Sequence, residues 1–69
     1  MSLMQELYDS EINASVSWFW DAGFEVKLGD YINGWKAEDQ VYTWAEVEAW
    51  LTARAIEHYP ESVFAKARR

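Results

Sequence analysis

The sequence contains no cysteine, a single proline and a single histidine among its 69 residues. Without cysteine no disulfide can form, and with His58 as the lone imidazole a structural zinc site of the usual kind is excluded. Chains of this size commonly need such a fastening, because one small core leaves only about 3–5 kcal/mol of stability. We therefore expect either an unusually good core or a partner, and no metal or other cofactor.

Long apolar stretches are also missing. The longest uncharged run, residues 12–20, is interrupted by Asn and Ser and is too short to span a bilayer. The first residues lack the basic and apolar segments of a signal peptide. These features lead us to expect a cytoplasmic protein with no membrane association.

Basic residues are few: there are 6 Lys and Arg against 12 Asp and Glu, for a net charge of −6. Half of the basic residues stand in the last four positions, so Lys27, Lys36 and Arg54 alone balance the acids of residues 1–65. That body carries a net charge of −9, from 12 acidic and 3 basic side chains. Nucleic-acid binding needs several cations converging on one surface, so we expect a protein partner and no nucleic acid.

The few glycines and the lone histidine exclude two classes of activity. Gly23, Gly29 and Gly34 each fit a turn, so no glycine-rich phosphate loop exists. Nucleophilic catalysis needs a Ser or Cys beside an oriented base. His58 falls late in a predicted helix, on its apolar side, where a hydrogen-bonded and partly buried ring is the simpler interpretation.

Acidic residues are abundant, which raises the possibility of a paired-carboxylate glycosidase. Asp21, Asp30 and Asp39 all fall at predicted loops or strand ends, and their spacing gives no convergent pair. Asp30 and Asp39 also lack the spacing of a calcium-binding loop. We therefore expect no enzymatic activity.

The clearest structural pattern is an alternation of apolar and polar residues over 12–20, broken only by Phe19. This alternation predicts a half-buried strand. Residues 21–23 then form a three-residue loop, and residues 24–28 alternate again. Closing a hairpin over this loop gives three apolar pairs on one face: Trp20–Phe24, Trp18–Val26 and Val16–Leu28.

A second hairpin is predicted at Asn33-Gly34, a dipeptide typical of a type I′ turn. The third strand then covers residues 35–42. Its pairing places Asp30 and Asp39 on the core face, so we expect a bulge at Gly29 or nearby that turns Asp30 outward. The predicted pairs across this hairpin are Ile32–Trp35 and Val26–Val41.

A helix is predicted to begin after Thr43, which with Glu46 makes a capping box. It ends near His58, because the residue before Pro60 is disfavoured in a helix. One face of this helix carries an apolar stripe with helical spacing: Trp44, Val47, Leu51, Ala55 and His58.

Ala45, Ala49 and Ile56 form a second, weaker apolar stripe on another side of the same helix. A helix that covers one sheet needs only the first stripe, so the second indicates a further neighbour. Short helices are expected over 3–8 and within 61–69, where acidic residues come first and basic ones last.

The 12 aromatic residues are the most informative feature. Alternation and helical spacing place Trp18, Trp20, Trp35 and Trp44 in the predicted core. Small domains enclose only about 60% of their surface, so the remaining apolar side chains indicate a contact surface. The residues expected on that interaction surface are Phe19, Tyr42, Ala49, Trp50, Ile56 and Phe64.

The run Phe24-Glu25-Val26-Lys27-Leu28-Gly29-Asp30, then Gly34-Trp35, then Thr43-Trp44-Ala45-Glu46, resembles HicB-like antitoxin domains. The resemblance covers residues 12–58. It implies a strand–strand–strand–helix order and a cytoplasmic antitoxin-type module that binds a basic partner protein without catalysis. The separate DNA-binding segment of many such proteins has no counterpart here.

The predicted fold is α+β: a three-stranded antiparallel meander packed against one main C-terminal helix, with short helical termini. Residues 1–69 form one domain with its core over about 12–58, and 1–10 and 60–69 are peripheral. The expected function is a non-enzymatic homo-oligomer, such as a dimer, or another protein-interaction module. A tryptophan-lined module that binds a carbohydrate or another small ligand is the alternative from a different class.

Overall fold

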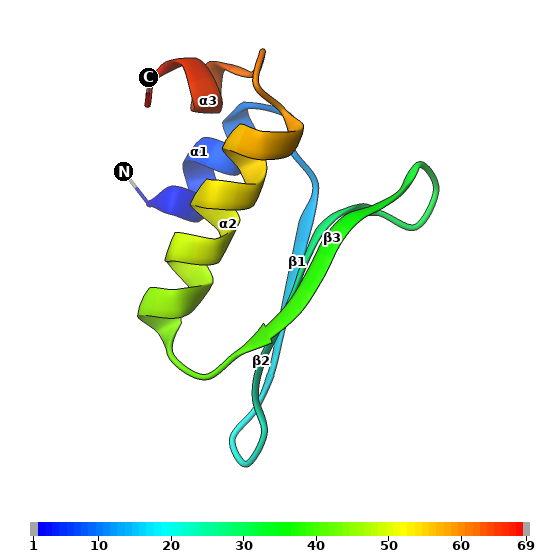
Figure 1. Cartoon of the computed structure of the whole chain (residues 1–69), viewed down its shortest axis with the longest axis vertical. Helices are drawn as coiled ribbons and strands as arrows, with labels where there is room; N and C mark the ends of the chain where they lie inside the picture. Colours follow the sequence, from blue (N-terminus) through cyan, green and yellow to red (C-terminus); the bar gives the residue numbers. More distant parts are fainter. Residues whose placement is uncertain (1, 69) are drawn as a thin grey trace.

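The computed structural model describes residues 2–68 and has an α+β fold in which a three-stranded antiparallel sheet packs against one main helix (Figure 1). The predicted fold class is therefore confirmed. Met1 and Arg69, which belong to the predicted terminal segments, lie outside the described residues. The elements are α1 (Leu3–Asp9), β1 (Ala14–Phe19), β2 (Gly23–Asp30), β3 (Gly34–Val41), α2 (Trp44–His58) and α3 (Val63–Lys66).

The first hairpin joins β1 to β2 two residues away from the predicted register. Trp18 pairs with Phe24 and Val16 with Val26, and the loop is 20–22 rather than 21–23. Because side chains alternate with a period of two, this shift keeps the apolar residues on the expected face. It moves Trp20 out of the sheet and into the loop. The predicted pairs Trp20–Phe24, Trp18–Val26 and Val16–Leu28 are therefore wrong.

Gly23 accounts for the position of this loop. It is the first residue of β2 and has a φ of +87°, and a Cβ atom there would lie 2.7 Å from the carbonyl oxygen of Val41. Only glycine combines this conformation with such a close approach of the neighbouring strand. Gly23 therefore pairs with Phe19 of β1 while lying close to the backbone of β3, and the loop closes one residue earlier than the composition suggests.

The second hairpin contains the expected bulge, between Leu28 and Gly29. Its turn covers residues 31–33, and Gly34 already belongs to β3. The predicted partners are wrong, since Val26 lies opposite Asp39 and Gly29 lies opposite Trp35. Residues opposite each other in a ladder share a face, so Asp39 points to the side of the sheet that carries buried Val26. Asp39 is nevertheless exposed, because β3 is an edge strand.

Asp30 accounts for the shape of the second turn. Its carboxylate accepts hydrogen bonds from the backbone N–H groups of Ile32 and Asn33, at 2.9 and 2.6 Å. The side-chain amide of Asn13 donates a further bond at 2.9 Å, which ties this turn to the segment before β1. The aspartate that looked misplaced in the sequence is thus a turn-capping group.

Helix α2 begins and ends where the sequence predicts. The Thr43 hydroxyl oxygen accepts the Glu46 N–H at 3.1 Å, and Glu46 reaches back to the Thr43 hydroxyl at 3.0 Å. The helix ends at His58, and Tyr59 is its C-cap. Within the predicted stripe Val47, Leu51 and Ala55 are fully buried.

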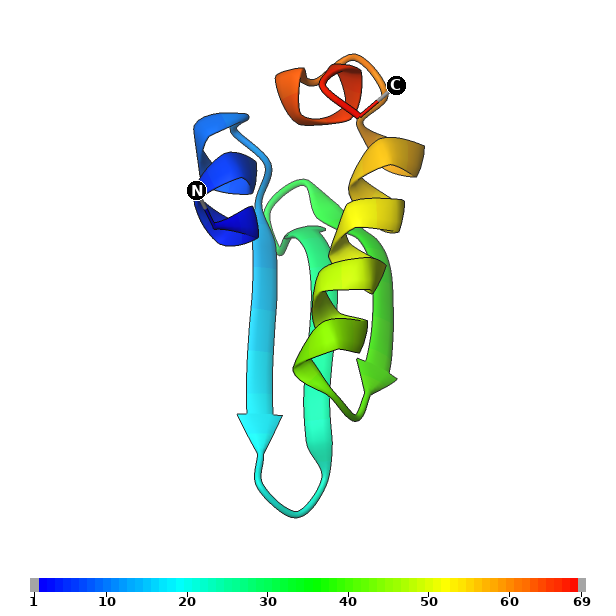
Figure 2. The same ribbon diagram turned by 90° about the vertical axis from the view of Figure 1, so that its left-hand side faces the viewer.

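Apart from Phe64 the buried core is aliphatic, and the predicted four-tryptophan core is wrong. Trp18 and Trp20 are 66% and 96% exposed, and Trp44 and Trp35 are 44% and 37% exposed. Helix α2 packs on β2 and β3, while both turns of the sheet project beyond it (Figures 1 and 2). Trp18, Trp20 and Trp35 lie toward those projecting ends, whereas Trp44 is the first residue of α2 and packs against Phe24 with much of its surface still in solvent. The buried apolar residues are Leu7, Ile12, Val26, Leu28, Val41, Val47, Leu51, Ala55, Phe64 and Ala65.

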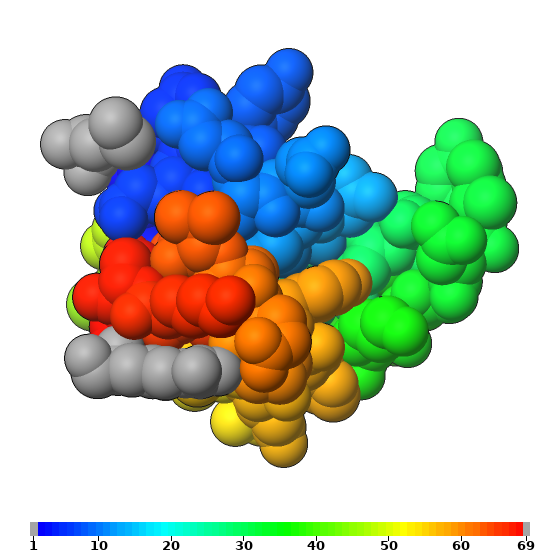
Figure 3. Space-filling view, turned by 90° about the horizontal axis from the view of Figure 1, so that it is seen from above, coloured from blue at the N-terminus to red at the C-terminus, as the bar shows by residue number. Residues whose placement is uncertain are grey.

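The two short helices lie side by side at the opposite end of α2 (Figure 3). The Arg68 guanidinium pairs with the Glu6 carboxylate at 3.1 Å and lies 3.7 Å from the centre of the Phe64 ring. Leu7 of α1 and Phe64 of α3 both enter the core. The two ends of the chain therefore contribute buried side chains to the core, whereas the four tryptophans predicted there do not.

Candidate interaction surface

Large apolar side chains are exposed in two groups at opposite ends of the sheet. One group, which we name the aromatic end, surrounds the β1–β2 loop and consists of Trp18, Phe19, Trp20, Tyr42 and Trp44. The other lies at the β2–β3 turn and consists of Tyr31, Ile32 and Trp35. Tyr8 and Val63 are exposed elsewhere. A cluster of aromatics is the composition that distinguishes protein interfaces from the rest of a surface.

On the helix side of the aromatic end, Phe24 connects two tryptophans. Its ring centre lies 6.4 Å from that of Trp18 and 5.8 Å from that of Trp44, with the second pair edge to face. Such pairs contribute about 0.5–1.5 kcal/mol beyond the area they bury. The row therefore holds both indoles in place although each keeps much of its surface in solvent.

On the other side of the hairpin, Phe19 and Tyr42 flank Gly23. Phe19 is the partner of Gly23 in the ladder, and a Cβ at Gly23 would lie 3.0 Å from the Tyr42 ring. The missing side chain lets Tyr42 lie against the strand. The Gln40 side-chain amide donates a hydrogen bond to the Ala22 carbonyl, which fastens the loop to β3.

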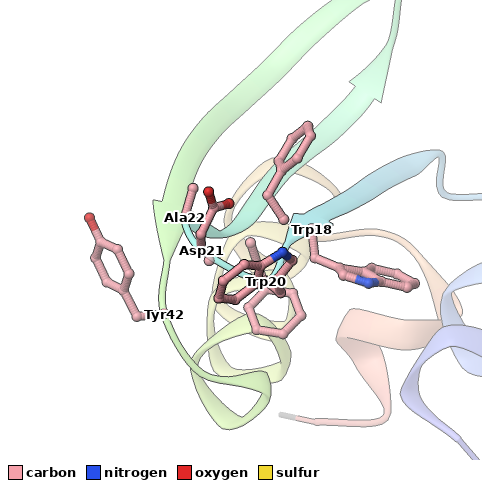
Figure 4. Close-up of a pocket in the computed structure, with 8 residues that line it drawn as sticks. Trp18, Trp20, Asp21, Ala22 and Tyr42 are labelled. Atoms are coloured by element: carbon pink, nitrogen blue, oxygen red, sulfur yellow. The ribbon is translucent and has the colours of Figure 1, made fainter.

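An open depression of about 340 Å³ surrounds this loop. Figure 4 shows Trp18 and Tyr42 pointing to opposite sides of the loop, with Trp20 between them and Asp21 beside Ala22. The loop is thus a ridge that carries aromatic side chains on both flanks, and the charged side chain of Asp21 lies at its turn. A ridge of this kind can insert into or lie against a partner surface.

The acidic residues considered for catalysis lie in three separate places: Asp21 in the first loop, Asp30 at the second turn, and Asp39 in β3. The Asp30 carboxylate accepts hydrogen bonds from the backbone N–H of Asn33 and from the side-chain amide of Asn13. These bonds hold the pKa of Asp30 below its ordinary value. His58 contacts Glu57, with its Nε2 3.5 Å from the carboxylate. Among residues 2–68 no cluster of three or more His, Asp or Glu could hold a metal ion.

The residues predicted on the interaction surface differ in their exposure in the structure. Phe19 and Tyr42 come together at the aromatic end, as described above. On α2, Ala49 is exposed, whereas Trp50 and Ile56 are half-buried, and Trp50 packs against the core. Phe64 is only 2% exposed. Its place on the predicted surface is wrong, because α3 turns its ring inward against α1 and α2.

Trp18 and Trp20 are surface residues that the sequence reasoning assigned to the core. One signal could have revealed them: Val47, Leu51 and Ala55 are the aliphatic part of the helical stripe, and they span only about two turns. A stripe of that length covers a short part of a sheet, so the far ends of long strands stay uncovered. Trp20 also stands directly beside the polar loop residue Asp21.

The comparisons with known proteins give no relative: no family model, no curated protein and no solved structure matches this chain. They therefore add nothing to the resemblance to HicB-like domains, which stays a hypothesis. Along residues 2–68 the structure contains no helix with the length and apolar character needed to cross a membrane.

Proposed function

We propose that this chain is a small, non-enzymatic, cytoplasmic protein-interaction module that associates with itself and that the aromatic end forms part of the contact surface. The observation that supports this proposal most is the exposure of Trp18, Phe19, Trp20 and Tyr42 in one place. Contiguous apolar patches on a soluble chain mark sites of association.

The electrostatics support a protein partner over nucleic acid. The body of residues 1–65 carries a net charge of −9, and none of its three cations belongs to the aromatic end. A surface without cations cannot release counterions from a phosphate backbone. An apolar surface on an acidic chain instead fits burial against another apolar surface.

The test is sedimentation velocity of the full chain from low to high micromolar concentration. Self-association predicts a sedimentation coefficient that rises with concentration to that of a dimer or a larger closed assembly. A chain that stays a folded monomer at high micromolar concentration, with near-native circular dichroism, would refute the proposal of self-association.

A second candidate is a module that binds a basic partner protein, as the resemblance to HicB-like domains implies. The strand–strand–strand–helix order over Ala14–His58 and the acidic body favour it. Affinity capture from a bacterial lysate should then recover one stoichiometric basic protein, and recovery of none would count against it.

A third candidate is a carbohydrate-binding module, favoured by the depression that Trp20, Tyr42 and Asp21 line. Sugar rings stack on exposed aromatics, and a nearby carboxylate accepts hydroxyl hydrogen bonds. Titration with a panel of glycans should then quench tryptophan fluorescence with saturation, and a flat response across the panel would dispose of this candidate.

A further inference from the structure

The two edges of the sheet differ in their protection against pairing with another strand. The strand order is β1-β2-β3, so β1 and β3 each have one free edge. β3 carries Lys36 and Glu38 as well as Asp39, whose side chain shares the face of buried Val26. Charges of this kind, including inward-pointing ones, are how edge strands avoid pairing. β1 has the sequence Ala-Ser-Val-Ser-Trp-Phe and carries no charge.

β1 is also the strand that the main helix covers least. Helix α2 packs on β2 and β3, and α1 lies beyond the N-terminal end of β1 (Figure 2). Figure 2 shows the flank of β1 free along its length. Val16, on the helix side of β1, is consequently only half-buried.

The backbone of β1 fixes which groups point to the free edge. The Gly29 N–H donates to the Asn13 carbonyl at 2.7 Å, so the pair Asn13 and Gly29 is hydrogen-bonded across the strands. Hydrogen-bonded pairs alternate with non-bonded pairs in an antiparallel ladder. The N–H and C=O groups of Ala14, Val16 and Trp18 therefore point away from β2, toward the free edge.

These outward groups match a second copy of the same strand. When two β1 strands lie antiparallel about a two-fold axis at Val16, Val16 faces Val16, and Ala14 faces Trp18 of the second copy. Each of these pairs can exchange both its N–H and C=O bonds. A shift by one residue would place outward groups against groups already bonded to β2, so only even shifts are possible.

The same register brings together two features on the helix-side face. Trp18 is 66% exposed on that face, four residues along the strand from Ala14. Ala14 borders an open hollow of about 240 Å³ whose lining includes Met4, Leu7, Tyr8 and Ile12. The two-fold axis at Val16 carries Trp18 of each copy over Ala14 of the other, at the mouth of this hollow. A projection and a hollow on one patch are what an isologous interface requires.

Of the two free edges of the sheet, β1 is the one whose strand carries no charged side chain. Two chains of net charge −6 repel each other, and β1 offers an uncharged line of contact. A stable interface takes about 800 Å² per partner, which is roughly a sixth of the 4791 Å² that the chain exposes. The β1 edge with Trp18, Tyr8 and the projecting loop provides a patch of that scale, since each buried aromatic contributes about 150–250 Å².

We propose that two copies of this chain join their β1 edges antiparallel about Val16 to form a continuous six-stranded sheet, with Trp18 of each copy packed over Ala14 of the other. This inference rests on the proposed self-association and specifies its geometry. The outer edges of the joined sheet are the charged β3 strands, so the assembly closes as a dimer.

The pairing of the two β1 strands can be tested with charges. In the proposed dimer Ser15 faces Ser17 of the second copy, on the face opposite Trp18. One double variant carries Ser15→Lys and Ser17→Lys, and the other carries Ser15→Glu and Ser17→Glu. Like charges then face each other in each variant alone, and opposite charges face each other in the mixture. Circular dichroism of each variant checks that the sheet forms.

The expected result is that the mixture forms a heterodimer about tenfold or more tighter than either variant pairs with itself. Sedimentation of the separate and mixed samples measures this preference. A mixture that behaves as the average of its two components would overturn the proposed pairing of the β1 edges.

A second pair of variants separates this geometry from self-association in general. Trp18→Ala should weaken the dimer by about 30-fold or more, as loss of a central aromatic anchor does. Tyr31→Ser, at the β2–β3 turn and 83% exposed, is the matched control and should change the dissociation constant less than about twofold. A wild-type dimer that tolerates Trp18→Ala would overturn the β1 geometry while leaving self-association standing. A wild-type chain that stays monomeric would overturn both.

Discussion

The aliphatic core can be tested by comparing one buried leucine with one exposed tryptophan. Leu51 is fully buried at the centre of α2, against β2 and β3. Replacing it with alanine removes buried methyl groups and leaves a cavity, which costs about 2–5 kcal/mol. A 69-residue chain has only about 3–5 kcal/mol of stability, so Leu51→Ala should be largely unfolded at room temperature.

Trp20 gives the opposite expectation. It is 96% exposed in the β1–β2 loop, so Trp20→Ala removes almost no buried surface, and the free energy of unfolding should change by less than about 0.5 kcal/mol. The sequence pattern alone predicts the reverse order, since it places Trp20 in the core and tryptophan is the larger residue.

The assay is urea unfolding followed by far-ultraviolet circular dichroism, at a concentration low enough to keep each variant monomeric. Low concentration matters because association stabilises the folded state by mass action. The midpoint for Leu51→Ala should fall close to zero denaturant, and that for Trp20→Ala should match the wild type. A larger loss for Trp20→Ala than for Leu51→Ala would refute the aliphatic core.

Three further substitutions test local features of the fold. Gly29→Ala should destabilise the chain by about 1–3 kcal/mol, because φ is +108° and the new Cβ would lie 2.7 Å from the Gly34 carbonyl oxygen; thermal unfolding measures the loss. Thr43→Ala removes the acceptor for the Glu46 N–H and should cost about 1 kcal/mol in urea unfolding. The pKa of Asp30 is lowered on folding, so its contribution is present above its ordinary value of 3.8 and disappears as pH falls through the lower folded-state value. Unfolding midpoints below pH 4 should therefore drop less in Asp30→Ala than in the wild type, and equal slopes would contradict this role.

The sequence predicted the elements of this fold because their signals are local. Thr43 and Glu46 mark the start of α2 through bonds between near neighbours, and Pro60 marks its end. The bulge beside Gly29 was predictable because an alternating pattern would otherwise have placed Asp30 in the core.

What the sequence could not predict is the lateral position of the helix over the sheet. Alternation places Trp18 on the correct face, but it does not say whether a helix covers that part of the face. Only the packing of Val47, Leu51 and Ala55 on β2 and β3 decides that. Phe64 is the converse case, since its burial depends on contacts with a helix more than 50 residues away in the chain.

The pairing of two β1 edges is tested most directly by finding which residues of the second copy contact Trp18 in the assembled protein. An equimolar mixture of isotope-labelled and unlabelled full-length chain permits detection of nuclear Overhauser effects between different copies only. We expect contacts between the Trp18 indole of one copy and the Ala14 methyl group of the other, with an intensity that grows with concentration. A concentrated, folded sample in which Trp18 gives no contact between copies would contradict the account.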